Sequence, residues 1–235
     1  MQKKILIIAP VWNEEKRIEK ALSGLPVDIA DVLVVDDGST DNTKIKAEEL
    51  GAKVISHHIN KGVGSAIRTG IDFAIENGYE IAVVISGGGK TRGEDVVPLL
   101  KPVLDGDVDL AQGSRYIKGG TRSNMPTHRL LGTKLYSLFF SISAGSIIKD
   151  ASSGFRAIRL SILKDKRINL HQDWLDRYEL EPYLLYKAVK LGYKVKEIPV
   201  TIEYPTRKNY TKMRAIIDWW KIFRPIVFLT LKIKK

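Results

Sequence analysis

The segment VVISGGGKTRGED, residues 83–95, contains groups that could bind phosphate. A run of β-forming residues leads into three glycines and then Lys90 and Thr91, which are the components of a nucleoside-triphosphate-binding P-loop. The spacing excludes that motif, because Val84 stands where the P-loop requires a glycine. Backbone N–H groups followed by a lysine can still bind a diphosphate. The segment is therefore a candidate anion site that needs another explanation than triphosphate hydrolysis.

Three more polar groups border apolar runs. Asp36 and Asp37 end the run VLVVDD, and a carboxylate there can accept hydrogen bonds from a ribose hydroxyl or a base N–H group. Gly38 then permits a tight turn. Residues 10–14 (PVWNE) place an acid near a helix start, and residues 58–66 (HINKGVGSA) place a lysine and two glycines before a helix, which favours phosphate. Taken singly, each group is explained equally well by a turn and a helix cap.

The elements that would position these groups follow a regular alternation. Short apolar runs separated by segments of helical spacing predict an α/β domain with a mostly parallel sheet and helices on both faces. Ligands of such sheets bind outside the carboxyl ends of the strands, where the polar groups lie. The expected strands are residues 5–10, 32–37, 53–57 and 81–86, and the expected helices include residues 14–22, 43–50, 64–75 and 178–191.

Composition narrows the class of protein. The chain has 235 residues, 44% of them hydrophobic, which suits one globular domain with a sizeable core. The absence of cysteine excludes disulfides and thiolate metal sites. A net charge of +11 predicts an anionic partner, which could be a nucleotide, a nucleic acid or a phospholipid surface. Nucleic-acid binding would rest on charge alone, since no motif supports it, and we do not expect it.

Two segments could meet a membrane. Residues 129–148 are basic and carry a bulky apolar face, and residues 212–235 carry aromatic residues beside lysine and arginine. Neither spans a bilayer, because the last uninterrupted apolar run, residues 226–231, is far shorter than the roughly 20 residues required. The aromatic residues suit a helix in the membrane interface, and packing on the domain is an equal alternative. They are Trp219, Trp220 and Phe223.

In this order, the strand-end groups resemble the motifs of family 2 glycosyltransferases with the GT-A fold. The resemblance extends over about residues 3–215 and is closest to the dolichyl-phosphate mannosyltransferase and polyprenyl-phosphate glucosyltransferase branch. It implies one GT-A domain over residues 1–211, with a nucleotide-sugar half (1–115) and an acceptor half (116–211), followed by an amphipathic segment (212–235). The later motifs are QGSRY (112–116), DASSGFR (150–156) and EIPV (197–200).

The resemblance implies transfer of a hexose, with inversion, from a GDP-mannose or UDP-glucose type of donor to a polyprenyl or dolichyl phosphate. We expect a peripheral protein at the cytoplasmic face of a membrane, held there by its lipid substrate or by an anchoring partner protein. The acceptor phosphate would meet Arg115, Arg156, Lys208 and Lys212. The nucleotide sugar would meet Pro10, Trp12, Glu14, Asp36, Gly38, Lys61, Gly62, Ser86, Gly87 and Gly88.

The resemblance fails at one motif. Relatives hold a divalent metal on an Asp-X-Asp motif, and the corresponding residues here are Ser86, Gly87 and Gly88. Hard cations usually need one or two carboxylates, so we expect either no metal or a weakly held Mg²⁺ or Mn²⁺. The leaving diphosphate still needs a positive charge. We therefore predict that Lys90 replaces the ion at least in part.

Several alternatives remain open on the sequence. If the acceptor were a hydroxyl, it would need a carboxylate base, and Asp150 is the candidate, with Arg156 between donor and acceptor. Glu179 and Glu181 are interpreted as helix-capping acids, and Glu94 and Asp95 as acids at a helix start. The main alternative function is a non-catalytic protein that binds a nucleotide sugar or an anionic lipid.

Overall fold

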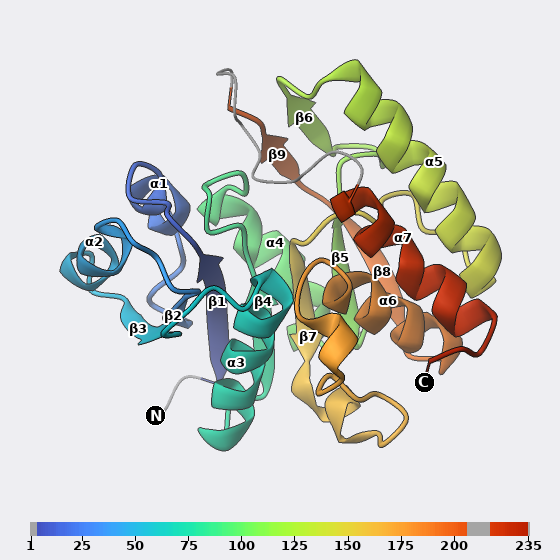
Figure 1. The fold of residues 1–235 in the computed structure, drawn as a ribbon, viewed down its shortest axis with the longest axis horizontal. Coiled ribbons are helices and arrows are strands. Elements are labelled where there is room, and N and C mark those ends of the chain that lie inside the picture. The colour runs from blue at the N-terminus through green and yellow to red at the C-terminus, as the bar shows by residue number, and fades with distance from the viewer. Residues whose placement is uncertain (1–3, 206–216, 235) are drawn as a thin grey trace.

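The computed structural model describes residues 4–205 and 217–234, without the side chain of residue 217. Its central sheet has seven strands in the order β3-β2-β1-β4-β7-β5-β8 (Figure 1). Every neighbouring pair is parallel except the two pairs that involve β7. This confirms the mostly parallel sheet. The strands are β1 (Ile5–Val11), β2 (Asp31–Asp36), β3 (Lys53–Ser56), β4 (Ile81–Val84), β5 (Leu110–Ser114), β7 (Arg156–Arg159) and β8 (Val195–Pro199).

Helices cover both faces of the sheet, as predicted. Alternate residues of β1 divide between two cores, with Leu6 and Ile8 in one and Ile5 and Ile7 in the other. The first core is closed by α3 (Val63–Glu76), α5 (Thr127–Ala144), α6 (Leu180–Lys190) and α7 (Ile217–Thr230). The second core is closed by α1 (Ile18–Leu22), α2 (Thr43–Glu49) and α4 (Val96–Leu104). Short 3₁₀ helices lie at Gly93–Asp95, Leu160–Lys164 and Asp173–Leu175.

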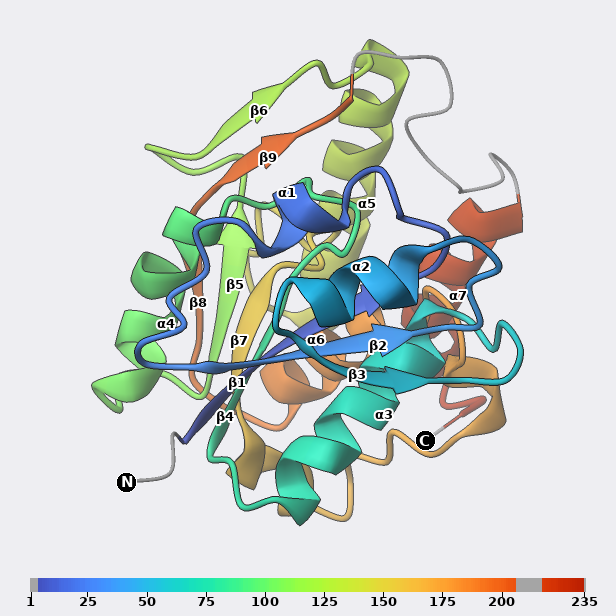
Figure 2. The ribbon, with the colours of Figure 1, turned by 90° about the vertical axis from the view of Figure 1, so that its left-hand side faces the viewer.

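A second, two-stranded sheet stands beside the central one. It consists of β6 (Thr121–Ser123) and β9 (Thr201–Glu203), which pair in parallel (Figure 2). The loop after β4 is attached to it, because Glu203 N donates to the carbonyl oxygen of Lys90 at 2.8 Å. An isolated bridge joins Thr91 to Ile202. The glycine-rich loop is thereby fixed to an element more than 100 residues later in the chain.

The strand order reverses between β1 and β4, and this is where α/β sheets of this kind bind ligands. Gly87 follows β4 and packs against the end of β1 so closely that a Cβ there would overlap the carbonyl group of Pro10. Gly70 similarly allows α3 to approach Ile8. At Gly87 the glycine therefore has a packing role in addition to any role in binding.

Helix α7 packs on the domain against α5 and α6. Trp219 and Phe223 contact the first core, and the Phe223 ring lies 5.0 Å from the Tyr136 ring. Trp220 remains 54% exposed. Packing therefore accounts for two of the three aromatic residues, while the expected boundary at residue 211 lies outside the described residues. Across residues 4–205 and 217–234, no helix is both long and apolar enough to cross a membrane.

Candidate active site

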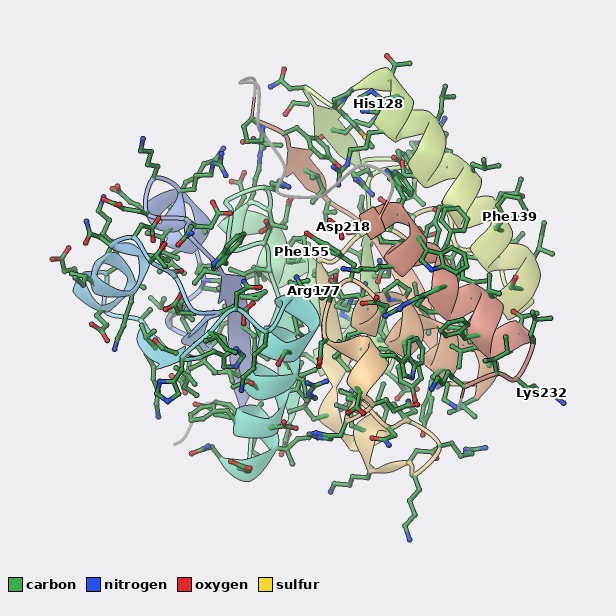
Figure 3. All side chains as sticks on the ribbon, in the orientation of Figure 1. His128, Phe139, Phe155, Arg177, Asp218 and Lys232 are labelled. Carbon is green, nitrogen blue, oxygen red and sulfur yellow. The ribbon has the colours of Figure 1, made fainter. Side chains whose placement is uncertain are left out.

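A cavity of about 660 Å³ opens at the carboxyl ends of β1 and β4. Both halves of the chain line it: β1 and the loop after β4 on one side, and α5, β7, α6 and α7 on the other. Figure 3 places Phe155, Arg177 and Asp218 at this junction, between the amino-terminal elements and α6 and α7. The cavity is therefore assembled from segments far apart in the sequence.

Charged side chains line the cavity with an excess of positive charge. Among the described residues, six cationic side chains and four carboxylates contribute to its wall. This excess suits a ligand with several negative charges. The cations are Arg17, Lys90, Arg115, Arg129, Arg156 and Arg177, and the acids are Glu14, Asp37, Glu181 and Asp218.

Seven of the ten residues predicted to bind the nucleotide sugar line the cavity, namely Pro10, Trp12, Glu14, Gly62, Ser86, Gly87 and Gly88. The other three do not. Asp36 is buried and accepts a hydrogen bond from Ser39 N at 3.1 Å. Gly38 has a φ of +71° and packs against the backbone at Ile59. Lys61 is exposed to solvent. For these three residues the turn interpretation describes the geometry better.

Asp37, rather than Asp36, reaches the cavity wall. Its carboxylate accepts hydrogen bonds from the backbone N–H groups of Lys61 and Gly62 at 2.9 and 2.7 Å. His57 Nδ1 lies 2.7 Å from the same carboxylate. Asp37 therefore fixes the loop before α3 against the end of β2, and His57 belongs to that arrangement.

Lys90 is partly buried in the cavity wall, and its Nζ lies 5.9 Å from the centre of the Tyr204 ring. Burial lowers the pKa of Lys90 to about 8, assisted by the positive charge of Arg129 and opposed by Glu14. Within the described part of the chain, no carboxylate forms an ion pair with this lysine. Its charge is available to a ligand.

The wall near Ser86 does not fit a divalent cation. Glu14 faces the loop, and a Cβ on Gly88 would lie 3.3 Å from its Oε1. Arg17 already pairs with this acid at 3.0 Å. Glu94 pairs with Arg92, and Asp95 accepts a hydrogen bond from Thr201 N at 2.7 Å. No group of three or more acidic, histidine or cysteine side chains in the described ranges is placed to hold a metal.

Asp150 does not line the cavity, contrary to its expected role as a base. It is fully buried, and Arg115 Nε and Nη2 donate to its two oxygens at 2.7 and 2.6 Å. Burial would lower the pKa of Arg115, but the ion pair with Asp150 outweighs burial and raises it. Arg115 also donates to Tyr204 Oη. The geometry makes Asp150 a positioning residue for Arg115, which does line the cavity.

Arg156 and Glu181 form a second buried pair in the wall. Arg156 donates to the carbonyl oxygens of Glu181 and Ser153 at 2.7 and 2.6 Å, and its Nε has no hydrogen-bond partner among the described residues. The Arg156 guanidinium lies 4.0 Å from the Glu181 carboxylate. Burial raises the pKa of Glu181 against the effect of Arg156. Glu181 thus belongs to the site rather than only to a helix start.

Sequence reasoning missed several residues of the wall: Arg17, Arg129, Arg177, Tyr204 and Asp218. Arg17 lies three residues after Glu14, a spacing that could have suggested their pair. The others have no local signal, because they reach the cavity through the packing of α5, of the segments next to α6 and β9, and of α7. The predicted acceptor residues Lys208 and Lys212 lie outside the described residues.

Comparison with known proteins shows which family the sequence matches. Residues 6–166 match the profile described as Glycosyl transferase family 2. The chain is 32% identical to polyprenol monophosphomannose synthase of Mycolicibacterium smegmatis, over 83% of this chain and 76% of that protein. It is 30% identical to UDP-N-acetylglucosamine–dolichyl-phosphate N-acetylglucosaminyltransferase of Methanococcus voltae, over 97% and 96% of the two chains.

Solved structures give the same fold. Glucosyl-3-phosphoglycerate synthase from Mycobacterium tuberculosis superposes with a TM-score of 0.72 over 99% of this chain and 81% of that chain, at 19% identity. The sheet and the flanking helices therefore have the GT-A fold. The chain belongs to glycosyltransferase family 2.

Proposed function

We propose that this protein transfers a hexose from a nucleotide sugar to a polyprenyl or dolichyl phosphate, with inversion at the anomeric carbon. One relative is named for making polyprenol monophosphomannose, and another for transferring N-acetylglucosamine to dolichyl phosphate. Their sugars differ, but both names specify a polyprenyl-type lipid phosphate. The proposal therefore specifies the class of acceptor. The nucleotide base and the sugar of the donor have to be found by testing several nucleotide sugars.

The observation that carries the proposal is the cationic cavity between the two halves of the chain. Six cations face four carboxylates in the wall. Glu14 pairs with Arg17, Glu181 with Arg156, and Arg115 with Asp150, which lies behind the wall. The remaining positive charge suits a donor diphosphate and an acceptor phosphate bound together. A merely structural network would be expected to balance its charges.

The proposed reaction needs no proton transfer to begin. A phosphate monoester is ionised near neutral pH, so its oxygen can attack the anomeric carbon without a general base. A new bond forms between that carbon and the acceptor oxygen, while the bond to the donor diphosphate breaks and its electrons leave with the nucleoside diphosphate. This fits a site in which Asp150 is occupied by Arg115.

Residues of the cavity divide between the two substrates in this proposal. Pro10, Trp12 and the loop after β4 would contact the donor, because they lie at the carboxyl ends of β1 and β4. Arg156, with its unpaired Nε, would bind the acceptor phosphate from β7, and Arg115 would lie between the two substrates. Asp150 and Glu181 would hold these arginines in place.

The proposed membrane contact is the outer face of α5. Four apolar side chains at helical spacing on this face are 52–70% exposed, and Phe139 lies on the same outer side at 47% (Figure 3). Lys134 and Lys149 are exposed on or just after the helix. An apolar stripe beside lysines suits a helix lying in the interface of an anionic bilayer. The four residues are Leu131, Leu135, Leu138 and Ile142.

An acceptor comparison tests the proposal. Labelled UDP- and GDP-sugars would be incubated in turn with a polyprenyl phosphate, the corresponding polyprenol, and 3-phosphoglycerate. We expect one donor to give a labelled lipid with the polyprenyl phosphate alone. Transfer to 3-phosphoglycerate or to the free alcohol would contradict the proposed acceptor, and donor binding without transfer to any acceptor would establish a binding protein.

A further inference from the structure

The loop that follows β4 lacks the two carboxylates of the metal-binding motif, and its central glycine is held by close packing. Gly87 occupies the central position of the motif, and any side chain there would overlap the carbonyl group of Pro10. A carboxylate at Gly88 would be built against Glu14. A side chain at Gly88 would begin 3.3 Å from Glu14 Oε1, and Arg17 already pairs with Glu14. The loop is shaped for close backbone packing and offers no carboxylate of its own.

Cations gather where those carboxylates are missing. Lys90 Nζ and the Arg129 guanidinium lie 5.9 and 5.3 Å from the centre of the Tyr204 ring, and Arg115 donates to the hydroxyl of the same tyrosine. The three cations come from the loop after β4, from α5 and from the end of β5. Tyr204 is buried in the cavity wall, so the three cations lie at one side of the cavity.

Hydrogen bonds fix the backbone of the loop at Lys90. Its carbonyl oxygen accepts a hydrogen bond from Glu203 N, and the neighbouring Thr91 hydroxyl accepts one from Ser86 N at 3.3 Å. Gly89 N also donates to the carbonyl oxygen of Ser86 at 3.1 Å. These bonds fix the point from which the Lys90 side chain enters the cavity, and a positive charge that is already near the diphosphate stabilises developing negative charge.

We infer that the protein binds the diphosphate of its donor without a divalent cation, and that Lys90, with Arg129 and Arg115 around Tyr204, supplies the positive charge that the ion supplies in relatives. The inference rests on the proposed function, because the diphosphate is that of the nucleotide sugar. When the bond to the anomeric carbon breaks, the diphosphate oxygen keeps the electron pair, and Lys90 remains protonated throughout.

Calorimetric binding of UDP and GDP tests the inference on the full chain. Each nucleotide would be titrated in EDTA and again in excess Mg²⁺ or Mn²⁺. We expect one of them to bind with an affinity that differs by less than about threefold between these conditions, since no ion contributes to the complex. An affinity that rises tenfold or more with metal would overturn the inference and leave the proposed function intact.

Variants distinguish a specific contribution of Lys90 to nucleotide binding from that of other basic residues on the surface. Lys90→Met should weaken binding in EDTA by roughly tenfold or more, as expected for loss of a charge-assisted hydrogen bond, and Lys90→Arg should retain most of it. Lys101→Met is the matched control, because Lys101 is exposed on α4 and pairs only with Asp105. Unchanged binding by a folded Lys90→Met variant would refute the role of Lys90.

No binding of either nucleotide to the wild-type protein under any condition would refute the proposed function and the inference together.

Discussion

At the residue scale, the charge of Lys90 depends on pH within the range of ordinary assays. Its pKa of about 8 means that the side chain is a cation below pH 8 and mostly neutral above it. Burial lowers this pKa most, Arg129, Arg17 and Arg115 lower it further, and Glu14 raises it. The Tyr204 ring lies beside the ammonium group. A bound diphosphate would raise the pKa, so binding above pH 8 requires uptake of a proton.

We therefore expect nucleotide affinity to fall as pH rises from about 7 to about 9.5. Calorimetry in buffers of different ionisation enthalpy would detect the proton uptake. Lys90→Arg should remove this dependence, because the arginine stays charged throughout the range. A wild-type affinity that is constant over this range would show that Lys90 does not contact the diphosphate.

Asp150 provides a second test at this scale. Asp150→Asn leaves the Arg115 charge buried with a weaker partner, and breaking a buried pair typically costs about 3–5 kcal/mol. We expect urea unfolding to show a loss of this order, whereas the exposed Asp105→Asn should leave the midpoint unchanged. If Asp150→Asn abolished transfer at full stability and full donor affinity, Asp150 would be acting as the base instead.

The sequence predicts the types of residue that form the site, but it does not predict which of several similar residues reaches the cavity. Asp36 and Asp37 are adjacent and both follow a buried run, so nothing local decides that Asp37 reaches the cavity. Glu181 resembles any acid near a helix start until β7 places Arg156 beside it. Lys90 could be predicted, because three glycines and a lysine after a strand have few structural explanations.

At the element scale, the loop after β4 is the least tolerant of substitution. Gly87→Ala would force the loop away from Pro10, and we expect it to lower the free energy of unfolding by about 1–3 kcal/mol and to weaken nucleotide binding. Gly88→Ala is the comparison, since its Cβ would meet only the end of the Glu14 side chain. Equal stabilities of the two variants would argue against the close packing at Gly87.

The outer face of α5 makes a separate prediction. Leu138→Glu with Ile142→Glu should reduce cosedimentation with phosphatidylglycerol vesicles at least about tenfold, because two apolar side chains would no longer enter the bilayer. The melting temperature should not change, since both side chains are exposed. Ile45→Glu, an equally exposed residue on α2, serves as the control. Unaltered vesicle binding would exclude α5 as the membrane contact.

Most elements could be predicted because their signals are local. The four amino-terminal strands are continuous apolar runs, and the structure places them within one or two residues of the expected bounds, as for β2 at Asp31–Asp36. Helix α1 begins at Ile18 rather than near Glu14, and the residues before it form turns in which the Glu14 and Glu15 N–H groups donate to the side chains of Thr43 and Asp41. Hydrogen bonds to residues so far away in the sequence leave no periodic pattern from which they could be predicted.

At the scale of the whole molecule, the cavity exists only because the two halves of the chain close on each other. Arg129, Arg177 and Tyr204 enter its wall through the packing of α5, α6 and β9. Their roles therefore could not be predicted from spacing. The net charge of +11 predicted an anionic partner but not where it binds, whereas the structure concentrates cations at one junction.

Transfer in the absence of metal tests the central claim most directly. The purified chain would be given polyprenyl phosphate in phosphatidylglycerol vesicles and labelled UDP- and GDP-sugars, in EDTA. We predict a labelled lipid from one donor, formed at a similar rate when Mg²⁺ is added and nearly lost in Lys90→Met. Product that forms only after Mg²⁺ or Mn²⁺ is added would contradict metal-independent transfer, and no product from any donor, with or without metal, would contradict the account of this protein as a lipid-phosphate glycosyltransferase.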